Sequence, residues 1–314
     1  MTVRSFLKLV EIQTKAASVT PFMLGTVYAL YAFHEFKVVN FLIMFISLIS
    51  FDMVTTAINN YMDYKKANKT YGYNYEKHNA IVRDNLSETT VVITIVVLLL
   101  IASVSGFALY LRTNLVVLLI GMMSFAVGIL YSFGPIPISR MPLGEIFSGF
   151  FMGFVIVFLS VFIHVYDKNI AYVTYSDGIL NVWFNVLVVL KIFFMSLPAV
   201  MGIANIMLAN NICDIEDDLE NRRYTLPIYI GKEKALKLFK ALYYISYIDI
   251  VALVILKVLP LLGLIVLLTF APVNKNIRKF YKAQTKKDTF PLSVKNFLII
   301  NVVEIIAIGL GLIL

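Results

Sequence analysis

The chain has 314 residues, of which 60% are hydrophobic and only 15% are charged. A soluble globular domain usually carries about 25% charged residues, so this composition favours lipid over water as the solvent. The formal net charge of +8 could indicate a nucleic-acid partner, but no basic face on a soluble module is visible, so nucleic acid is not expected. Cys213 is the only cysteine, which excludes a disulfide within the chain.

Apolar runs long enough to cross a hydrocarbon core of about 30 Å recur along the whole chain. They are predicted near 17–34, 39–60, 89–111, 115–133, 144–166, 182–210, 236–256, 258–273 and 294–314. The eighth run is short, so eight spans remain an alternative to nine. The runs are continuous and do not alternate with period two, which argues against a β-barrel. The sequence therefore predicts one domain, residues 1–314, that folds as an all-α bundle of about nine transmembrane helices around a central cavity.

The orientation follows from the basic residues, because short loops on the cytoplasmic side of a membrane are rich in Lys and Arg. Most of the 27 basic residues lie in the amino-terminal segment and in every second loop after it. The alternate loops hold only Lys37, Arg112, Lys168 and Lys257. We therefore expect a cytoplasmic amino terminus and cytoplasmic loops at 61–88 and 211–235.

These two long polar loops each follow an apolar helix that ends in paired asparagines. Residues 59–63 and 210–214 share the pattern N-N-x-x-D about half a chain apart. The match is typical of an internal repeat, in which two related halves each bring a polar helix end to a common site. We expect two pseudo-repeated halves with one such motif in each.

Residues four positions apart lie on one face of a helix, so the motifs form two polar faces. Asn59 and Asp63 lie on the first face, and Asn210, Asp214 and Asp218 lie on the second. Capping of a solvated helix end would explain some of these residues. Carboxylates beside lipid are costly unless they meet cations or water, which favours a functional role.

Carboxylate and amide oxygens without a cluster of His or Cys suit Mg²⁺, which binds through one or two carboxylates and substrate phosphates. A diphosphate is then the expected partner, and an isoprenoid diphosphate would explain why the site is surrounded by apolar helices. Cations that could bind this diphosphate follow each motif in the sequence. They are Lys65 and Arg83 after the first motif, and Arg222 and Arg223 after the second, although the arginine pair could equally mark the cytoplasmic face.

The two motifs together resemble the aspartate-rich motifs of the UbiA superfamily of intramembrane prenyltransferases. Three further segments resemble its 1,4-dihydroxy-2-naphthoate branch: Lys15-Ala16-Ala17-Ser18, Tyr131-Ser132-Phe133-Gly134-Pro135 with Leu143-Gly144-Glu145, and Asp214-Ile215-Glu216-x-Asp218 with Thr225-Leu226 and Gly231. Four positions depart from the family pattern, since Asn60 and Ala67 replace Asp, and Cys213 and Leu219 replace Arg.

The resemblance implies Mg²⁺-dependent transfer of a polyprenyl chain to the naphthoate ring with loss of its carboxylate, in a bacterial cell membrane. It implies that Asn59, Asp63, Asn210, Asp214 and Asp218 hold the metal. The catalytic residues it implies are Asp63, Asp214, Asp218 and Glu145, the last of which lies in the Leu-Gly-Glu segment. Asp52, two turns before Asn59, is expected either to line the cavity or to bond a neighbouring helix.

Three other functions fit parts of the pattern. The acceptor could be a hydroxybenzoate, a homogentisate or a haem vinyl group, with the same prenyl chemistry. A secondary transporter also has repeats and intramembrane acids, but its site tends to lie near the bilayer midplane and not at helix ends. A relic that binds substrate without turnover would fit Asn60, Ala67 and Cys213. The prenyl chain length and the oligomeric state do not follow from the sequence.

Overall fold

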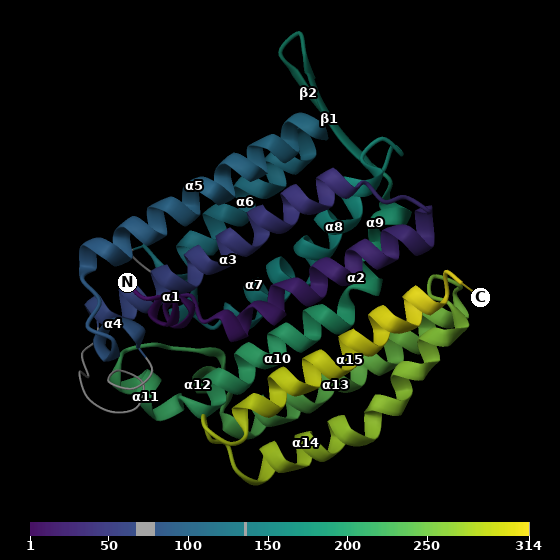
Figure 1. The fold of residues 1–314 in the computed structure, drawn as a ribbon. Coiled ribbons are helices and arrows are strands. Elements are labelled where there is room, and N and C mark those ends of the chain that lie inside the picture. Colours follow the sequence, from purple (N-terminus) through teal and green to yellow (C-terminus); the bar gives the residue numbers. More distant parts are fainter. Residues whose placement is uncertain (67–78, 135–136, 314) are drawn as a thin grey trace.

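The computed structural model describes residues 1–66, 79–134 and 137–313, which form a bundle of helices with one projecting hairpin (Figure 1). Within this part of the chain, eight helical segments are long and apolar enough to cross a membrane, and a bent pair of helices makes a ninth if it is one span. The all-α membrane fold is therefore confirmed.

The helices of the first half are α1 (Val3–Leu9), η1 (Ile12–Lys15), α2 (Ala16–Phe33), α3 (Val38–Lys66), α4 (Ala80–Arg83), α5 (Glu88–Arg112), α6 (Leu115–Ser132) and η3 (Ile138–Arg140). Those of the second half are α7 (Gly144–Ser148), η4 (Gly149–Val155), α8 (Ile156–Val165), α9 (Val186–Met195), α10 (Leu197–Cys213), α11 (Ile215–Glu220), α12 (Leu226–Ile230), α13 (Lys232–Ile255), η5 (Leu261–Thr269), α14 (Phe270–Lys282) and α15 (Phe290–Leu310).

The sixth predicted span, 182–210, is wrong at its amino-terminal end. A β-hairpin of β1 (Ala171–Ser176) and β2 (Ile179–Phe184) occupies this region and projects from the bundle beyond α6 (Figure 1). Asp177 and Gly178 form its two-residue turn with φ values of 51° and 78°, the left-handed pair that such a turn requires. The apolar residues of β2 continue into those of α9, so hydropathy alone did not separate strand from helix.

The rest of this span is bent by 50° between α9 and α10. Pro198 lies in the first turn of α10. A proline lacks the backbone N–H and its ring clashes with the carbonyl four residues earlier, so the helix cannot continue straight through Ser196. The eighth predicted span, 258–273, also differs, because the helical segment runs from Leu261 to Lys282. Its charged final turns continue the helix after the apolar run has ended.

α10 lies at the centre of the second half of the bundle, where it contacts α13, α15, α7 and η4. The contact with η4 depends on Gly153, since a Cβ built there would lie 2.5 Å from the Cα of Val200. A similar close approach joins α2 to α8, where a Cβ on Gly25 would lie 2.5 Å from the carbonyl oxygen of Val157. Small residues allow membrane helices to pack this closely.

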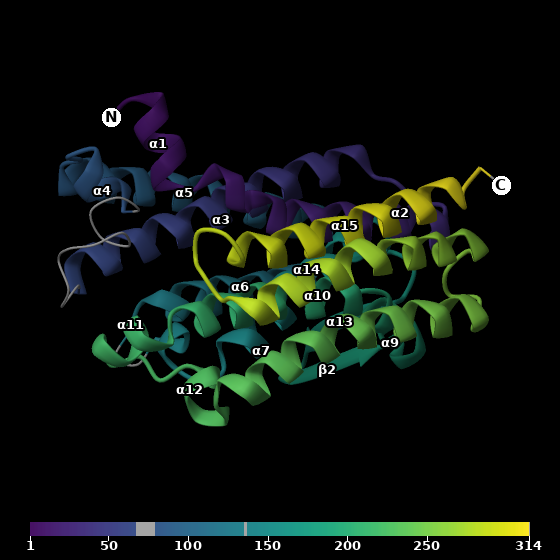
Figure 2. The same cartoon turned by 90° about the horizontal axis from the view of Figure 1, so that it is seen from below.

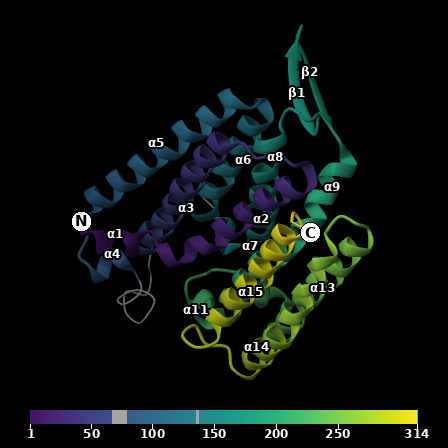
Figure 3. The same cartoon turned by 45° about the vertical axis from the view of Figure 1, so that its right-hand side comes forward.

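Both N-N-x-x-D motifs lie at the same end of the bundle. Figures 1 and 2 show the carboxyl end of α3 beside α4 at the end that also carries α11 and α12, while the hairpin and the carboxyl terminus lie at the other end. Figure 3 shows the same separation from a third direction. α3 continues as one helix through its motif to Lys66, whereas α10 stops at Cys213, immediately before Asp214.

Candidate functional site

The first motif lies on the last turns of α3. The hydroxyl of Ser132, at the end of α6, donates a hydrogen bond of 3.1 Å to Oδ1 of Asn59. Asp63 is one turn further along the helix and is exposed. The first motif thus presents the amide oxygen of Asn59, which the bond from Ser132 orients, and the carboxylate of Asp63 one turn further along α3. Ala67 falls outside the described residues.

Asn60, at a position where the family often has Asp, is buried and has a structural role. Its Nδ2 donates to the backbone carbonyl of Leu9 (2.9 Å) and to Oε1 of Glu11 (3.2 Å). The backbone carbonyl oxygen of Asn60 accepts a hydrogen bond from Nδ2 of Asn79 (2.8 Å). A carboxylate has no N–H to donate and would be repelled by Glu11. The departure from Asp therefore follows from contacts that tie α3 to the amino-terminal segment and to the start of α4.

The second motif presents two oxygens that already bind a cation. Nζ of Lys286, in the loop between α14 and α15, donates to Oδ1 of Asn210 at 2.5 Å and forms an ion pair with Oδ2 of Asp214. Asn210 Nδ2 lies 3.4 Å from the same Asp214 oxygen. The side chains of Asn210 and Asp214 are thus in contact as predicted, although α10 ends at Cys213 and Asp218 lies on the separate helix α11.

Asp218 lies on α11 and is almost completely buried, with 4% of its surface exposed. The hydroxyl of Thr225 donates to its Oδ2 at 3.1 Å, and Nε of Arg223 lies 3.5 Å from its Oδ1. Burial raises the pKa of Asp218 to about 6, although Arg223 acts in the opposite direction. The carboxyl group is therefore poised to change its charge close to neutral pH.

Glu145, at the start of α7, is hydrogen-bonded to the second motif. Asn211 Nδ2 donates to Glu145 Oε1 at 2.9 Å, and among the described residues Oε2 has no hydrogen-bond partner. The hydroxyl of Tyr131, on α6, donates to the sulfur of Met207 on α10 at 3.4 Å. Tyr131 precedes Ser132, the partner of Asn59. The end of α6 therefore lies against both of the helices that carry the motifs.

The four predicted diphosphate-binding cations lie in different surroundings. Lys65 is exposed and forms an ion pair of 2.8 Å with Glu88 at the start of α5. Arg83 donates from Nε (2.8 Å) and Nη2 (3.1 Å) to its neighbour Asp84. Arg222 is exposed, with a φ of 53°. Arg223, by contrast, lies against the acidic cluster, so this arginine is the best placed of the four to meet a ligand there.

Asp52 accepts hydrogen bonds from residues of the two preceding helical segments, η1 and α2. Lys15 Nζ donates to its Oδ1 (2.6 Å) and to Oγ1 of Thr56 (2.7 Å), while the hydroxyl of Ser18 donates to its Oδ2 (2.5 Å). Lys15 and Asp52 are both largely buried, with 5% and 14% of their side-chain surface exposed. The Lys-Ala-Ala-Ser segment therefore fixes α3, two turns before Asn59, against α2.

The described part of the chain contains no group of three or more His, Cys, Asp or Glu side chains that could hold a metal ion. The donor set nevertheless fits Mg²⁺, because Mg²⁺ needs only one or two protein carboxylates when phosphates supply the remaining ligands. Asn210 and Asp214 already direct two oxygens at the ammonium of Lys286, which shows that this pair can surround a cation.

Sequence reasoning missed Lys286, Asn211 and Tyr131. Lys286 lies in a stretch with several other basic residues, and it is 72 residues from Asp214 in the chain, so no local pattern distinguishes it. Tyr131 and Asn211 lie inside segments that resemble the family, so the signal for them was present in the sequence. Their contacts could not be read from it.

The fold and the site together define an integral membrane protein with carboxylate, amide and cationic groups gathered at one end of a helical bundle. The model of the UbiA prenyltransferase family matches residues 18–300, so the chain belongs to that family and is a prenyltransferase. The predicted resemblance is thereby confirmed. A relative from Bacillus subtilis (strain 168), 1,4-dihydroxy-2-naphthoate octaprenyltransferase, is 32% identical over 233 residues, which are 74% of this chain and 68% of the relative.

Solved structures of the family share the fold. A UbiA homologue from Aeropyrum pernix K1 is 19% identical with a TM-score of 0.66, over 94% of this chain and 97% of that one. A UbiA homologue from Archaeoglobus fulgidus, bound to GPP and Mg²⁺, is 14% identical with a TM-score of 0.67, over 99% of this chain and 100% of that one.

Proposed function

We propose that the protein transfers a polyprenyl chain from an isoprenoid diphosphate to 1,4-dihydroxy-2-naphthoate, with Mg²⁺ bound and with loss of the ring carboxylate. The observation that carries the proposal is the convergence of Asn210 and Asp214 on one cation, beside the buried Asp218. The name of the Bacillus subtilis relative supports the acceptor, and the GPP and Mg²⁺ bound to the Archaeoglobus fulgidus homologue support the donor and the metal.

In this proposal the two motifs bind the metal and the diphosphate. Asn59 and Asp63 act from α3, and Asn210, Asp214 and Asp218 act from the second motif. Mg²⁺, when bound, neutralises the charge that builds on the diphosphate as its C–O bond breaks.

The cationic side chains share this task. Arg223 lies beside Asp218, and Lys286 can turn from Asp214 to a phosphate oxygen once a metal satisfies the carboxylate. Lys65, Arg83 and Arg222 would have to leave their present positions to reach the same diphosphate. We therefore assign the main electrostatic contribution to Arg223 and Lys286.

The acceptor half of the reaction uses Glu145. Its Oε2, without a hydrogen-bond partner among the described residues, can accept a proton from a hydroxyl of the naphthoate ring. The electron-rich ring carbon that bears the carboxylate then forms a bond to the prenyl carbon, and diphosphate leaves with the electron pair of the broken C–O bond. Loss of CO₂ returns the electrons of its C–C bond to the ring and restores aromaticity.

The apolar helices explain why this chemistry takes place in a membrane, since burial of each CH₂ of the prenyl chain contributes about 0.8 kcal/mol. The proposal includes a bacterial cell membrane and a cytoplasmic amino terminus, supported by the concentration of Lys and Arg at the motif end. We also propose that the chain consists of two pseudo-repeated halves, which the shared pattern in residues 59–63 and 210–214 supports.

The proposal is tested by the mass of the product. The purified protein is incubated with farnesyl or a longer prenyl diphosphate, dihydroxynaphthoate, and either Mg²⁺ or a chelator. We expect the prenylated quinol with Mg²⁺ only, and turnover reduced by about 10²–10³ in Asp214→Asn and Asp218→Asn. Hydroxybenzoate and homogentisate are supplied in parallel. Turnover of one of these without turnover of the naphthoate would change the acceptor, and the absence of any prenylated product would refute the proposal.

A further inference from the structure

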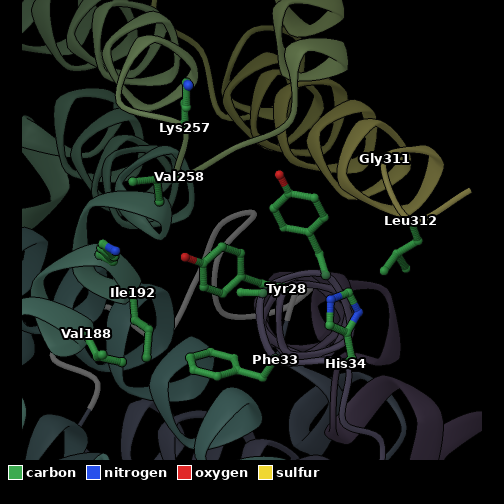
Figure 4. A pocket seen from close by; sticks show the side chains of 12 residues that line it. Tyr28, Phe33, His34, Val188, Ile192, Lys257, Val258, Gly311 and Leu312 are labelled. Carbon is green, nitrogen blue, oxygen red and sulfur yellow. The ribbon is translucent and has the colours of Figure 1, made fainter. Parts of the chain in front are cut away.

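A second site lies at the end of the bundle opposite α11 and α12. A cavity of about 470 Å³ opens there between the ends of α2 and α15, the amino-terminal turns of α9 and the turn that follows α13. This volume is within the range of about 300–1,000 Å³ that is usual for ligand sites. The polar groups that line it are Tyr28, Tyr31, His34, Lys191 and Lys257. Figure 4 shows Tyr28, His34 and Lys257 around the opening, with Leu312 at its edge.

The two lysines of the cavity differ from the other basic residues at this end of the bundle. Three of those others bind partners within the chain: Lys37 with Asp167 (2.6 Å), Lys168 with Glu35 (2.9 Å), and Arg112 with Asn40 (3.1 Å). Within the described residues, neither Lys191 nor Lys257 has an ion-pair or hydrogen-bond partner, and no acidic side chain lines the cavity. The cavity therefore concentrates positive charge that nothing in the described structure neutralises.

Ammonium, phenol and imidazole groups are donors to phosphate oxygens, and positive charge favours a negatively charged ligand. The rim of the cavity is partly apolar, since Val188, Val258 and Leu312 line it and Leu312 leaves 40% of its surface exposed. Lys257 and Leu312 each lie two residues after the end of a candidate membrane span, which is the depth expected for lipid head groups. Unpaired ammonium groups at this depth are suited to form charge-assisted hydrogen bonds with the phosphate of a lipid head group.

We propose that this cavity binds the head group of an anionic phospholipid, with the phosphate between Lys191 and Lys257 and the acyl chains against the apolar rim. The bound lipid would connect the ends of α2, α9, α13 and α15. It would therefore stabilise the bundle at the end remote from the site of prenyl transfer. This inference does not depend on the acceptor or the metal of the proposed reaction.

The test uses the full-length protein, freed of bound lipid in detergent, and native mass spectrometry with phosphatidylglycerol and phosphatidylcholine of the same acyl chains. We expect at least tenfold tighter binding of phosphatidylglycerol, and loss of this preference in the double variant Lys191→Ala/Lys257→Ala. The matched control is Lys168→Ala, which removes a lysine from the same end that is paired with Glu35. The control should keep the preference.

Two further measurements complete the test. Phosphatidylglycerol should raise the Tm of the wild-type protein and of Lys168→Ala, but not that of the double variant. Glycerol 3-phosphate, which has the anionic group without acyl chains, should compete poorly. Equal binding of the two lipids, or an unchanged preference in the double variant, would overturn the proposal. Effective competition by glycerol 3-phosphate would also overturn it, because the ligand would then be a free anion and not a lipid.

Discussion

Replacement of Lys286 by Ala is expected to strengthen the binding of a divalent metal to the substrate-free enzyme. In the structure the ammonium of Lys286 occupies the space between Asn210 Oδ1 and Asp214 Oδ2, where a metal would be held. A metal that binds there must first displace this internal cation. The lysine therefore competes with the metal until a diphosphate arrives to receive it.

The magnitude follows from the burial of the pair. The side chains of Lys286 and Asp214 are 27% and 16% exposed, so their ion pair lies between an exposed and a buried one. Exposed pairs contribute about 0.2–1 kcal/mol, and breaking a buried pair costs about 3–5 kcal/mol. For this partly buried pair we take about 1.4 kcal/mol, which corresponds to a tenfold lower Kd for the metal.

The assay is a titration of the substrate-free protein with Mn²⁺, a spectroscopic substitute for Mg²⁺, followed by kinetics with prenyl diphosphate. We expect Lys286→Ala to bind Mn²⁺ about tenfold more tightly and to have a higher KM for the diphosphate. Lys287→Ala is the control, because Lys287 is the exposed neighbour in the same loop. Unchanged or weaker Mn²⁺ binding in Lys286→Ala would refute the competition argument.

Three other outcomes follow from the site. Asn60→Asp, which replaces an amide by a carboxylate beside Glu11, should lower the free energy of unfolding by about 1–3 kcal/mol in detergent, and an unchanged stability would contradict the structural role of this amide. Because burial raises the pKa of Asp218 to about 6, its carboxyl group gains a proton as the pH falls below 6, so Mn²⁺ affinity should drop between pH 7 and pH 5; a flat profile would contradict this. Arg223→Ala should reduce kcat/KM for the prenyl diphosphate by at least tenfold, and the exposed Arg222→Ala by much less, so equal effects in steady-state kinetics would argue against the inward position of Arg223.

The sequence predicted the bundle and the motif residues because both depend on local spacing. Continuous apolar runs identify membrane spans, and the spacing of four residues brings the side chains of Asn210 and Asp214 into contact. The spacing did not show that α10 ends at Cys213 and that Asp218 lies on a separate helix. The hairpin at residues 171–184 was missed, although Asp177-Gly178 is a strong turn signal. The apolar strand after this turn continues directly into α9, and the hydropathy pattern gave priority to one long helix.

Contacts between distant parts of the chain could not be predicted. The interaction of Lys286 with Asp214 depends on how α14 and α15 return to the motif end, which no local pattern encodes. The same holds for Asn60, whose side-chain amide donates a hydrogen bond to the backbone carbonyl of Leu9 in α1, 51 residues away in the chain. In the sequence, the departure from the family's Asp fits a relic without turnover, whereas in the structure the amide of Asn60 forms hydrogen bonds that a carboxylate could not donate.

The proposed reaction is best tested by an experiment that follows prenyl transfer and CO₂ release in one tube. The purified protein is supplied with prenyl diphosphate, Mg²⁺ and dihydroxynaphthoate labelled in its carboxyl group, and the prenylated quinol and the released labelled CO₂ are quantified together. We expect equal amounts of the two, because attack at the carboxylate-bearing carbon must be followed by loss of CO₂. A prenylated product that keeps its label, or release of labelled CO₂ without prenyl transfer, would contradict the proposed reaction.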